Sequence, residues 1–256
     1  MRQIRAYCPS LISDKNIHSL HELPPEISHH LQRVLRLKVN DFVEIFDGKG
    51  NSFLAEIQAL GKKISIKIIK ILIQNTPLKC KIHLVIGLGK GEKMDWIIQK
   101  ATELGVYSIH PVITDRSEVH LSEERQLKKH QHWYNIMINA CEQCGLNRLV
   151  QLEKIDSLKH WLTGKHTQWL QESDNALKLM PHLGNDYPSL KIWAEKQPDA
   201  NTIFLLIGPE GGFANQEVLL AQEYGFQLTT LGSRTLRMET AAITTIALSQ
   251  TFWGDN

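Results

Sequence analysis

The most constraining feature of this chain is an alternation that runs from Ile82 to the C-terminus. Short apolar runs, typical of strands buried in a parallel sheet, alternate with segments whose apolar residues recur every three or four positions. One such helical segment spans Met94 to Leu104 and stops at Gly105, and a longer one begins at Ser122. This order predicts a mainly parallel sheet with helices on its faces. The predicted strands are IHLVIG, VYSIHPVI, LKLM, IFLLI and FQLTTL.

The first 72 residues follow a different pattern. Three alternating or β-branched runs (42–47, 52–60 and 63–72) are separated by the turn signals DGKGN and GKK, which predicts a small β-barrel or meander. Before them, residues 28–37 carry apolar and basic positions at helical spacing. Residues 73–81 show no clear period and contain Asn75 and Pro77, which favours a linker. We therefore expect one domain over residues 1–72 and another over 73–256.

Charge separates the same two regions. The chain has a formal net charge of +2, but residues 1–72 hold 11 Lys and Arg against 7 Asp and Glu, a net +4, and the remainder is net −2. A basic first domain favours RNA docking at that end, although an excess of four charges is also common on small domains without nucleic-acid partners.

Composition bounds the class and the compartment. With 42% hydrophobic and 22% charged residues, the sequence is typical of an ordinary globular protein. No apolar run approaches the roughly 20 residues of a membrane span, and the first ten residues lack the apolar stretch of a secretory signal. Four scattered cysteines fit a reducing compartment. We expect a cytoplasmic protein with no membrane segment.

Two loops stand out as candidate ligand sites. The apolar run Thr202 to Ile207 ends abruptly in Gly-Pro-Glu-Gly-Gly, and a ligand can lie against glycine backbone because no Cβ intervenes. In open α/β sheets, ligands bind at the carboxyl ends of strands, where this loop belongs. The competing interpretation is a tight turn into a helix capped by Asn215. A second loop, Leu231 to Arg237, repeats the arrangement after FQLTTL.

Together, IGPEGGF (207–213) and LGSRTLRMETAA (231–242) resemble the cofactor loops of the SPOUT class of methyltransferases. Within that class the sequence is similar to the family that methylates uridine N3 in 16S ribosomal RNA of the small subunit. RVLRL (33–37), IIQKATELGV (97–106) and ACEQCG (140–145) extend the likeness over nearly the whole chain. The departures from the family pattern are Asn40 for Gly, Leu146 and Val150 for Arg and Pro, and Thr235 for Ile.

The resemblance implies a PUA-like RNA-binding β-barrel (1–72) followed by a SPOUT α/β domain with a C-terminal trefoil knot (73–256). It further implies S-adenosyl-L-methionine as cofactor, a homodimer formed through the knot helices, and 16S rRNA, within the small ribosomal subunit, as substrate. Two alternatives stay open: the same fold acting on another RNA position, and a non-enzymatic RNA-binding assembly factor.

Site residues follow from the loops and from the resemblance. Methyl transfer to uridine N3 needs a deprotonated ring, so a cation beside it favours the reaction, and Arg237 is the leading candidate. Glu239 either orients Arg237 or helps remove the proton, or it is simply a carboxylate at a helix N-terminus. The expected cofactor-binding residues are Leu179, Leu206, Ile207, Gly208, Pro209, Glu210, Gly211, Gly212, Leu231, Gly232, Ser233, Leu236 and Thr240. The expected RNA-binding residues are Arg2, Arg5, Arg33, Arg36, Lys38, Lys90, Lys93, Arg116 and Arg148.

Other motifs point to no further chemistry. GLGKGEKMD (87–95) lacks the G-x-x-x-x-G-K-[ST] spacing of a triphosphate loop. Cys141 and Cys144 form a single CxxC inside a predicted helix, which favours packing of two small side chains over a redox or metal role. The histidines form no HxxxH or HxH set with nearby carboxylates, so we expect no metal.

Overall fold

The computed structural model describes residues 4–9, 18, 20–73, 77–117, 122–164, 175–184 and 186–254. The chain divides into two compact units. The first comprises Met1–Pro77 together with Ile138–Leu149, and the second comprises Leu78–Met137 together with Val150–Asn256. The predicted boundary between residues 72 and 73 assigned Ile138–Leu149 to the second domain, whereas this segment belongs to the first unit. Nothing in the sequence marks the change, because the helical periodicity continues into this segment without a break.

The first unit is built on a five-stranded mixed sheet in the order β1-β3-β4-β5-β2. β1 pairs in parallel with β3 and the remaining pairs are antiparallel. Register shifts between β4 and β5 bend the sheet around an apolar core. Among the described residues β1 and β2 do not pair, so the predicted barrel is an open half-barrel. Its elements are β1 (Arg5–Tyr7), β2 (Leu20–Glu22), α1 (Pro25–His29), η2 (His30–Val34), β3 (Phe42–Phe46), β4 (Ser52–Ala59) and β5 (Ser65–Ile73).

The helix expected over residues 28–37 begins earlier and ends earlier than its periodicity suggested. Pro25 occupies its first position, and η2 is a π-helix that stops at Val34. Arg36 and Asn40 both have positive φ, at 55° and 72°. Asparagine tolerates this left-handed region better than most residues, which accounts for Asn40 at a position where the family usually has glycine.

The end of α3 (Glu123–Cys144) and the residues after it are fastened to the strands of the first unit. Arg5 pairs with Glu44 at 2.5 Å and donates to Asn147 Oδ1 at 2.6 Å. The backbone N–H of Tyr7 donates to the Glu142 carboxylate at 3.1 Å. Burial raises the pKa of Glu142, although this hydrogen bond and the charges of His30 and Arg5 oppose the rise. These contacts explain why Ile138–Leu149 belongs to the first unit.

The second unit confirms the predicted parallel sheet. Its strand order is β12-β10-β11-β6-β7-β8, β9 also pairs with β7, and every pairing is parallel. Its remaining elements are β6 (Lys81–Gly87), α2 (Lys93–Glu103), β7 (Ser108–Ile113), β8 (Gln151–Leu152), β9 (Asp156–Ser157), α4 (Leu158–Thr163), β10 (Ala176–Pro181), α6 (Leu190–Lys196), β11 (Thr202–Ile207), α7 (Asn215–Glu223), β12 (Gln227–Thr229) and α8 (Met238–Trp253).

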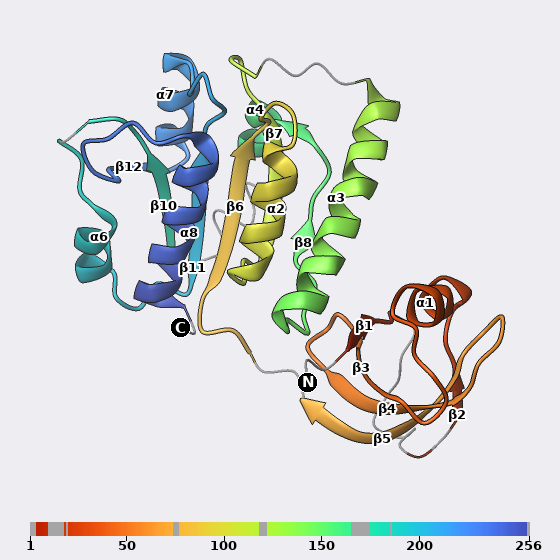
Figure 1. Cartoon of the computed structure of the whole chain (residues 1–256). Coiled ribbons are helices and arrows are strands. Elements are labelled where there is room, and N and C mark those ends of the chain that lie inside the picture. The colour runs from red at the N-terminus through yellow and green to blue at the C-terminus, as the bar shows by residue number, and fades with distance from the viewer. Residues whose placement is uncertain are drawn as a thin grey trace. The chain divides into compact units, whose positions relative to one another are not determined.

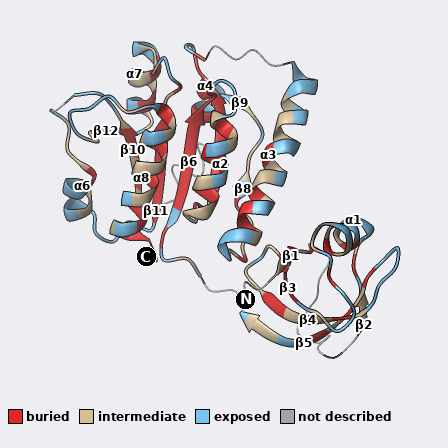
Figure 2. Cartoon of the chain, in the orientation of Figure 1, coloured by how far each residue is buried: buried red, intermediate tan, exposed pale blue. Residues whose placement is uncertain are grey.

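Helices cover both faces of this sheet (Figure 1). On one face, α4 and α7 pack over a core that includes Val85, Phe204 and Trp161. On the other, α2 and α8 lie side by side over β6 and β11. Because side chains alternate along a strand, β6 and β11 supply apolar residues to both layers and are buried along almost their whole length (Figure 2). No helix among the described residues is long and apolar enough to cross a membrane.

Candidate functional site

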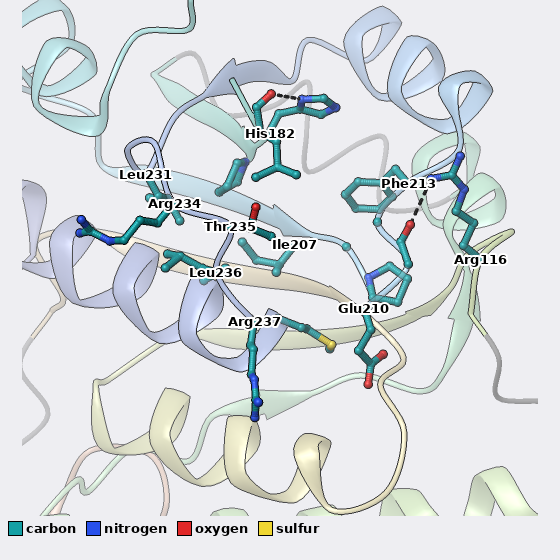
Figure 3. A pocket seen from close by; sticks show the side chains of 18 of the residues that line it. Arg116, His182, Ile207, Glu210, Phe213, Leu231, Arg234, Thr235, Leu236 and Arg237 are labelled. Atoms are coloured by element: carbon teal, nitrogen blue, oxygen red, sulfur yellow. Dashed lines mark hydrogen bonds between the residues drawn. The ribbon is translucent and has the colours of Figure 1, made fainter. Parts of the chain in front are cut away.

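A pocket of about 670 Å³ lies at the carboxyl ends of β10, β11 and β12, three neighbouring strands of the parallel sheet. This volume is within the range of small-molecule sites, roughly 300–1,000 Å³. All of its walls belong to the second unit (Figure 3). The lining residues are Lys93, Arg116, Pro181, His182, Leu183, Ile207, Gly208, Pro209, Glu210, Gly211, Gly212, Phe213, Asn215, Leu231, Gly232, Arg234, Thr235, Leu236, Arg237, Met238 and Ala241.

The loop after β11 is both a tight turn and a pocket wall, so the two interpretations of its glycines are compatible. The backbone N–H of Gly212 donates to the Pro209 carbonyl at 2.9 Å, which closes the turn. Gly212 has φ +67°, and a Cβ added there would meet no atom within 4 Å. Its backbone therefore faces open space in a conformation that side chains rarely adopt. The expected cap Asn215 is instead the first residue of α7 and lines the pocket.

A buried carboxylate fastens this loop to the loop after β7. Glu217 Oε2 accepts the backbone N–H of Ala214 at 2.8 Å, and its Oε1 accepts that of Asp115 at 2.9 Å. Beside it, the Arg116 guanidinium donates to the Gly211 carbonyl at 3.1 Å. The glycine loop is thus held by side chains from two other parts of the second unit. Glu217 was not among the residues predicted from the sequence, because its only signal there is its place three residues after Ala214 at the start of a helix.

The opposite side of the loop approaches β6 and α2. A Cβ on Gly87 would lie 2.6 Å from Pro209 Cδ, so only glycine fits there. Glu210 accepts the backbone N–H of Lys90 at 3.1 Å and forms an ion pair with Lys93 Nζ at 2.7 Å. Burial opposes ionisation of Glu210, but these hydrogen bonds outweigh it and lower its pKa. An anion-binding position before α2 is therefore occupied by the protein's own carboxylate, which agrees with the rejection of a triphosphate loop.

The loop after β12 supplies apolar walls and two cations, Arg234 and Arg237. Gly232, at φ +101°, again presents backbone to open space, while Leu231 and Leu236 line the pocket. Arg237 is the N-cap of α8, where its carbonyl accepts the backbone N–H of Ala241 at 2.8 Å. The side chains of Arg237 and Glu210 extend to the side of the pocket on which α2 lies (Figure 3).

A third loop was missed by the sequence analysis. Pro181, His182 and Leu183 follow β10 and line the pocket. The run LKLMPHLG carried no glycine cluster, so nothing local distinguished it from an ordinary strand end. Only the sheet order, which places β10 between β11 and β12, brings it to the site.

Five of the predicted catalytic and cofactor-binding residues do not line the pocket. Leu179 and Leu206 are fully buried within their strands and support the pocket from beneath. Ser233 and Thr240 are exposed elsewhere on the second loop and on α8. Glu239 is half-buried, and its Oε2 is buried without a hydrogen-bond donor among the described residues. Its side chain leaves α8 away from the face that Met238 and Ala241 present to the pocket.

The predicted RNA-binding residues are spread over both units. Arg2 lies outside the described residues. Arg5 is largely buried in its pair with Glu44, so it serves the fold of the first unit. Arg33, Arg36 and Lys38 are exposed around η2, and Arg148 is half-buried at the end of the first unit. In the second unit, Lys93 and Arg116 line the pocket and Lys90 is exposed beside it.

Within the described part of the chain, no group of three or more His, Cys, Asp or Glu residues could hold a metal ion. The CxxC pair lies at the C-terminal end of α3 rather than in its middle. Cys141 is buried and Cys144 is exposed, so the expectation of two packed side chains holds for one of them.

Two family models match the chain. Residues 76–250 match the model described as the RNA methyltransferase domain, and residues 23–70 match the one described as the RNA methyltransferase PUA domain. The parallel sheet with its strand-end pocket and the separate half-barrel therefore define an RNA methyltransferase with a PUA domain.

Curated relatives narrow this class. Ribosomal RNA small subunit methyltransferase E of Buchnera aphidicola is 32% identical over 94% of this chain and 92% of its own length. The protein of the same name from Bacillus subtilis is 29% identical over 84% of this chain and 83% of its own. The chain belongs to the ribosomal RNA small subunit methyltransferase E family, which confirms the resemblance inferred from its loops.

Two solved structures share the fold at similar identity. A methyltransferase of Legionella pneumophila with bound S-adenosylmethionine is 36% identical with a TM-score of 0.86, and the match covers 100% of both chains. The small subunit methyltransferase E of Neisseria gonorrhoeae, also bound to S-adenosylmethionine, is 33% identical with a TM-score of 0.86 over 99% of both chains.

Proposed function

We propose that this protein transfers a methyl group from S-adenosylmethionine to N3 of a specific uridine in 16S rRNA. The observation that carries the proposal is the pocket formed by three strand-end loops, with bare glycine backbone on its walls and Arg237 at its edge. Membership of the methyltransferase E family and its cofactor-bound structural neighbours support the same reaction.

The pocket fits the proposed cofactor. Ile207, Phe213 and Leu236 offer apolar surface to an adenine ring, and backbone groups near Gly212 and Gly232 are accessible to ribose and methionine polar atoms. We assign cofactor contacts to the predicted residues that line the pocket: Ile207, Gly208, Pro209, Glu210, Gly211, Gly212, Leu231, Gly232 and Leu236. Leu179 and Leu206 act by supporting these walls.

When bound, the cofactor supplies an electrophilic methyl group and a neutral thioether as leaving group. The residues of this chain then have two tasks, namely to align the nucleophile with that methyl and to stabilise the charge of the deprotonated uracil ring. Arg237 serves the second task, because its guanidinium brings several N–H donors to the edge of the pocket. Since Glu239 lies outside the pocket lining, we assign it to the start of α8, where a carboxylate interacts favourably with the helix dipole.

RNA docking is proposed for the exposed cations of the first unit, Arg33, Arg36 and Lys38, with Arg148, Lys90 and Arg116 as further contacts. A base within folded rRNA has to be presented by contacts to the surrounding backbone, and cations on a PUA domain suit that role.

We propose a trefoil knot in the second unit. Residues 229 and 230 bond to the Pro188 carbonyl, and the chain then returns from the edge strand β12 to place α8 over the central strands β11 and β6. These hydrogen bonds bring the end of β12 against Pro188, which precedes α6, and this contact supports a threaded C-terminus. A homodimer formed through α2 and α8, a cytoplasmic location, and the small ribosomal subunit as substrate complete the proposal.

The function is tested by deleting the gene and mapping methylated nucleotides of 16S rRNA. We expect one uridine to lose its N3 methyl group, and purified protein with S-adenosylmethionine to restore it on isolated subunits. Unchanged methylation would contradict the proposal, and loss at another position would assign the same fold to a different target. Loss of subunit assembly without any change in methylation would favour a non-enzymatic assembly factor.

A further inference from the structure

We propose that Lys93 is a second cationic group of the methyl-transfer site and donates a hydrogen bond to a carbonyl oxygen of the target uracil ring. This inference rests on the proposed function and adds to it the residue that shares the ring's negative charge with Arg237. The sequence alone had favoured RNA phosphates as the partners of Lys93.

Lys93 is positioned for a directed contact within the pocket. It lies in the first turn of α2, lines the same pocket as Arg237, and forms its 2.7 Å ion pair with Glu210. Its side chain is 36% exposed, so it is neither buried nor freely solvated. An ammonium group has three donors, and Glu210 takes one of them, which leaves two N–H groups for a ligand in the pocket. Figure 3 shows Arg237 and Glu210, the ion-pair partner of Lys93, extending to the same side of the pocket.

Charge balance favours a ring oxygen over a phosphate as the partner of Lys93. The lowered pKa of Glu210 keeps that carboxylate ionised, so the Lys93–Glu210 pair carries no net charge and its carboxylate repels a phosphate. A ring oxygen with partial charge accepts an oriented N–H without that penalty. Arg237 then supplies a positive charge that offsets the charge of a uracil anion. Arg116, Arg234 and His182 also line the pocket, whereas Glu239, Asp95 and His132 on the adjoining helices do not.

The contact between Lys93 and a ring oxygen has its largest effect while the uracil ring is deprotonated, before the methyl group is transferred. The N3 proton leaves to solvent water, and the resulting negative charge spreads over N3 and the two ring oxygens. The N3 electron pair then forms the new N–C bond as the C–S bond breaks, and the bonding pair moves to sulfur. The ring charge is largest before transfer, so a cation at a ring oxygen makes N3 more acidic on the enzyme.

The experiment compares Lys93→Gln, Lys93→Arg and Lys100→Gln in the full-length protein. Substrates are small ribosomal subunits from cells lacking the protein and tritiated S-adenosylmethionine, and kcat and KM are measured against pH. Lys100 is the matched control because it lies on the same helix and pairs with Glu103 at 2.8 Å with 33% exposure, but outside the pocket.

We expect Lys93→Gln to lower kcat about 100-fold at neutral pH. Removal of one hydrogen-bond donor that stabilises a developing anion usually has an effect of this size. The deficit should shrink as pH rises, because alkali ionises N3 without help. Lys93→Arg should retain most of the rate, and Lys100→Gln should keep the wild-type pH profile. Subunits carrying 5-fluorouridine, whose N3 is more acidic, should partly rescue Lys93→Gln.

Two outcomes would overturn the inference. A raised KM for subunits with an unmoved pH profile would leave Lys93 as a phosphate contact. Reduced cofactor affinity by calorimetry, with a normal pH profile at saturating cofactor, would leave it as a support of the glycine loop through Glu210. Absence of methyl transfer by the wild-type protein would contradict the proposed function instead. The wild-type assay therefore separates a failure of the proposed function from a failure of the inference about Lys93.

Discussion

At the scale of single residues, Arg237 combines a hydrogen-bonded backbone with an exposed cationic side chain. Its carbonyl begins the hydrogen-bond ladder of α8, and its backbone is extended, with φ −64° and ψ 153°. The side chain is exposed at the pocket edge, with no ion pair to hold it among the described residues. Removing the guanidinium should therefore change the chemistry of the site without changing the loop that carries it.

Arg237→Ala should keep its affinity for S-adenosylmethionine and lose about 10²- to 10³-fold in kcat, the usual effect of removing one stabilising donor. Calorimetry reports the affinity, and tritiated methyl transfer to small subunits reports the rate. Turnover at the wild-type level would remove Arg237 from the proposed mechanism.

Gly212→Val should lower cofactor affinity at least 100-fold. A β-branched residue is strained at φ +67°, and its side chain would project into the space that the pocket encloses. Gly145→Val is the control, because Gly145 has φ +92° and open surroundings but belongs to the first unit. Both variants should lose about 1–2 kcal/mol of stability from backbone strain, but only Gly212→Val should fail in cofactor calorimetry. Equal affinities would contradict the placement of the glycine loop.

Residue patterns predicted two of the three loops of the site. Gly208 to Gly212 and Leu231 to Arg237 were predictable because glycine after a buried strand leaves a local signature. His182 was not, because its place in the pocket depends on the order of strands in the sheet. Glu239 was expected near the chemistry from its neighbourhood in sequence, but the turn of α8 directs its side chain away from the pocket.

At the scale of elements, the sequence predicted strands well because burial on both faces leaves continuous apolar runs, as in β6 and β11. The sequence predicted elements less well where tertiary contacts determine whether an element forms or which unit it joins. β1 and β2 are three residues each and carry no period of their own. The last turns of α3 belong to the first unit because Glu142 and Asn147 bond to strand residues far away in sequence.

Three neighbouring elements, β6, β7 and α4, bury a chain of polar groups that the apolar pattern of the sequence did not reveal. Trp161 Nε1 donates to His110 Nδ1 at 3.1 Å, His110 Nε2 lies 2.7 Å from Ser108 Oγ, and Ser108 Oγ lies 2.7 Å from His83 Nδ1. Because Trp161 can only donate, His110 accepts at Nδ1 and the hydrogen bonds run toward His83 Nδ1. Burial, assisted by the charge of Lys81, lowers the pKa of His83 to about 4.

This lowered pKa predicts a stability loss in acid. Between pH 6.5 and about 4 the unfolded chain binds a proton at His83 that the folded chain does not, so stability falls as pH falls through this window. The loss from pH 7 to pH 5 should be about 2 kcal/mol from this residue, at ~1.4 kcal/mol per pKa unit. His83→Phe keeps the ring stacked on Phe204 and should lack this component in denaturant titrations at both pH values. An unchanged difference between the two pH values would show that His83 is not the titrating group.

At the scale of the whole molecule, the two units divide the expected work between RNA docking and methyl transfer. The exposed cations Arg33 and Arg36 lie on the first unit, and the pocket lies wholly within the second. The sequence predicted these two tasks without predicting where one unit ends and the other begins. The regular periodicity of α3 gives no sign that its C-terminal end belongs to the first unit.

Charge reversal at Arg33 and Arg36 together should weaken binding to 16S rRNA and reduce its salt dependence, by about one unit of slope for each phosphate that is no longer neutralised. Cofactor affinity should not change, because neither residue lines the pocket. Lys128→Glu is the charge control on the other unit, since Lys128 is 75% exposed on α3. An equal effect of the control would indicate general attraction rather than a docking surface.

The homodimer proposal rests on the outer face of α2 and α8. These helices run in the same direction, since Met238 lies beside Gly89 and Gln250 donates to the Leu104 carbonyl at 2.7 Å. Trp96 on α2 and Leu248 on α8 are 44% and 36% exposed, so each of the two neighbouring helices offers a large apolar side chain to a partner. A second copy presenting the same face would form a two-fold interface.

Trp96→Glu should convert the dimer to a monomer in analytical ultracentrifugation, because each interface would then contain two carboxylates in place of two indole rings. Leu127→Glu is the control, since Leu127 is 64% exposed on α3, away from α2 and α8. The folded monomer should retain its thermal transition, because Trp96 contributes little to the core of its own chain at 44% exposure. A wild-type protein that sediments as a monomer would contradict the dimer directly, and a Trp96→Glu dimer would move the interface away from these helices.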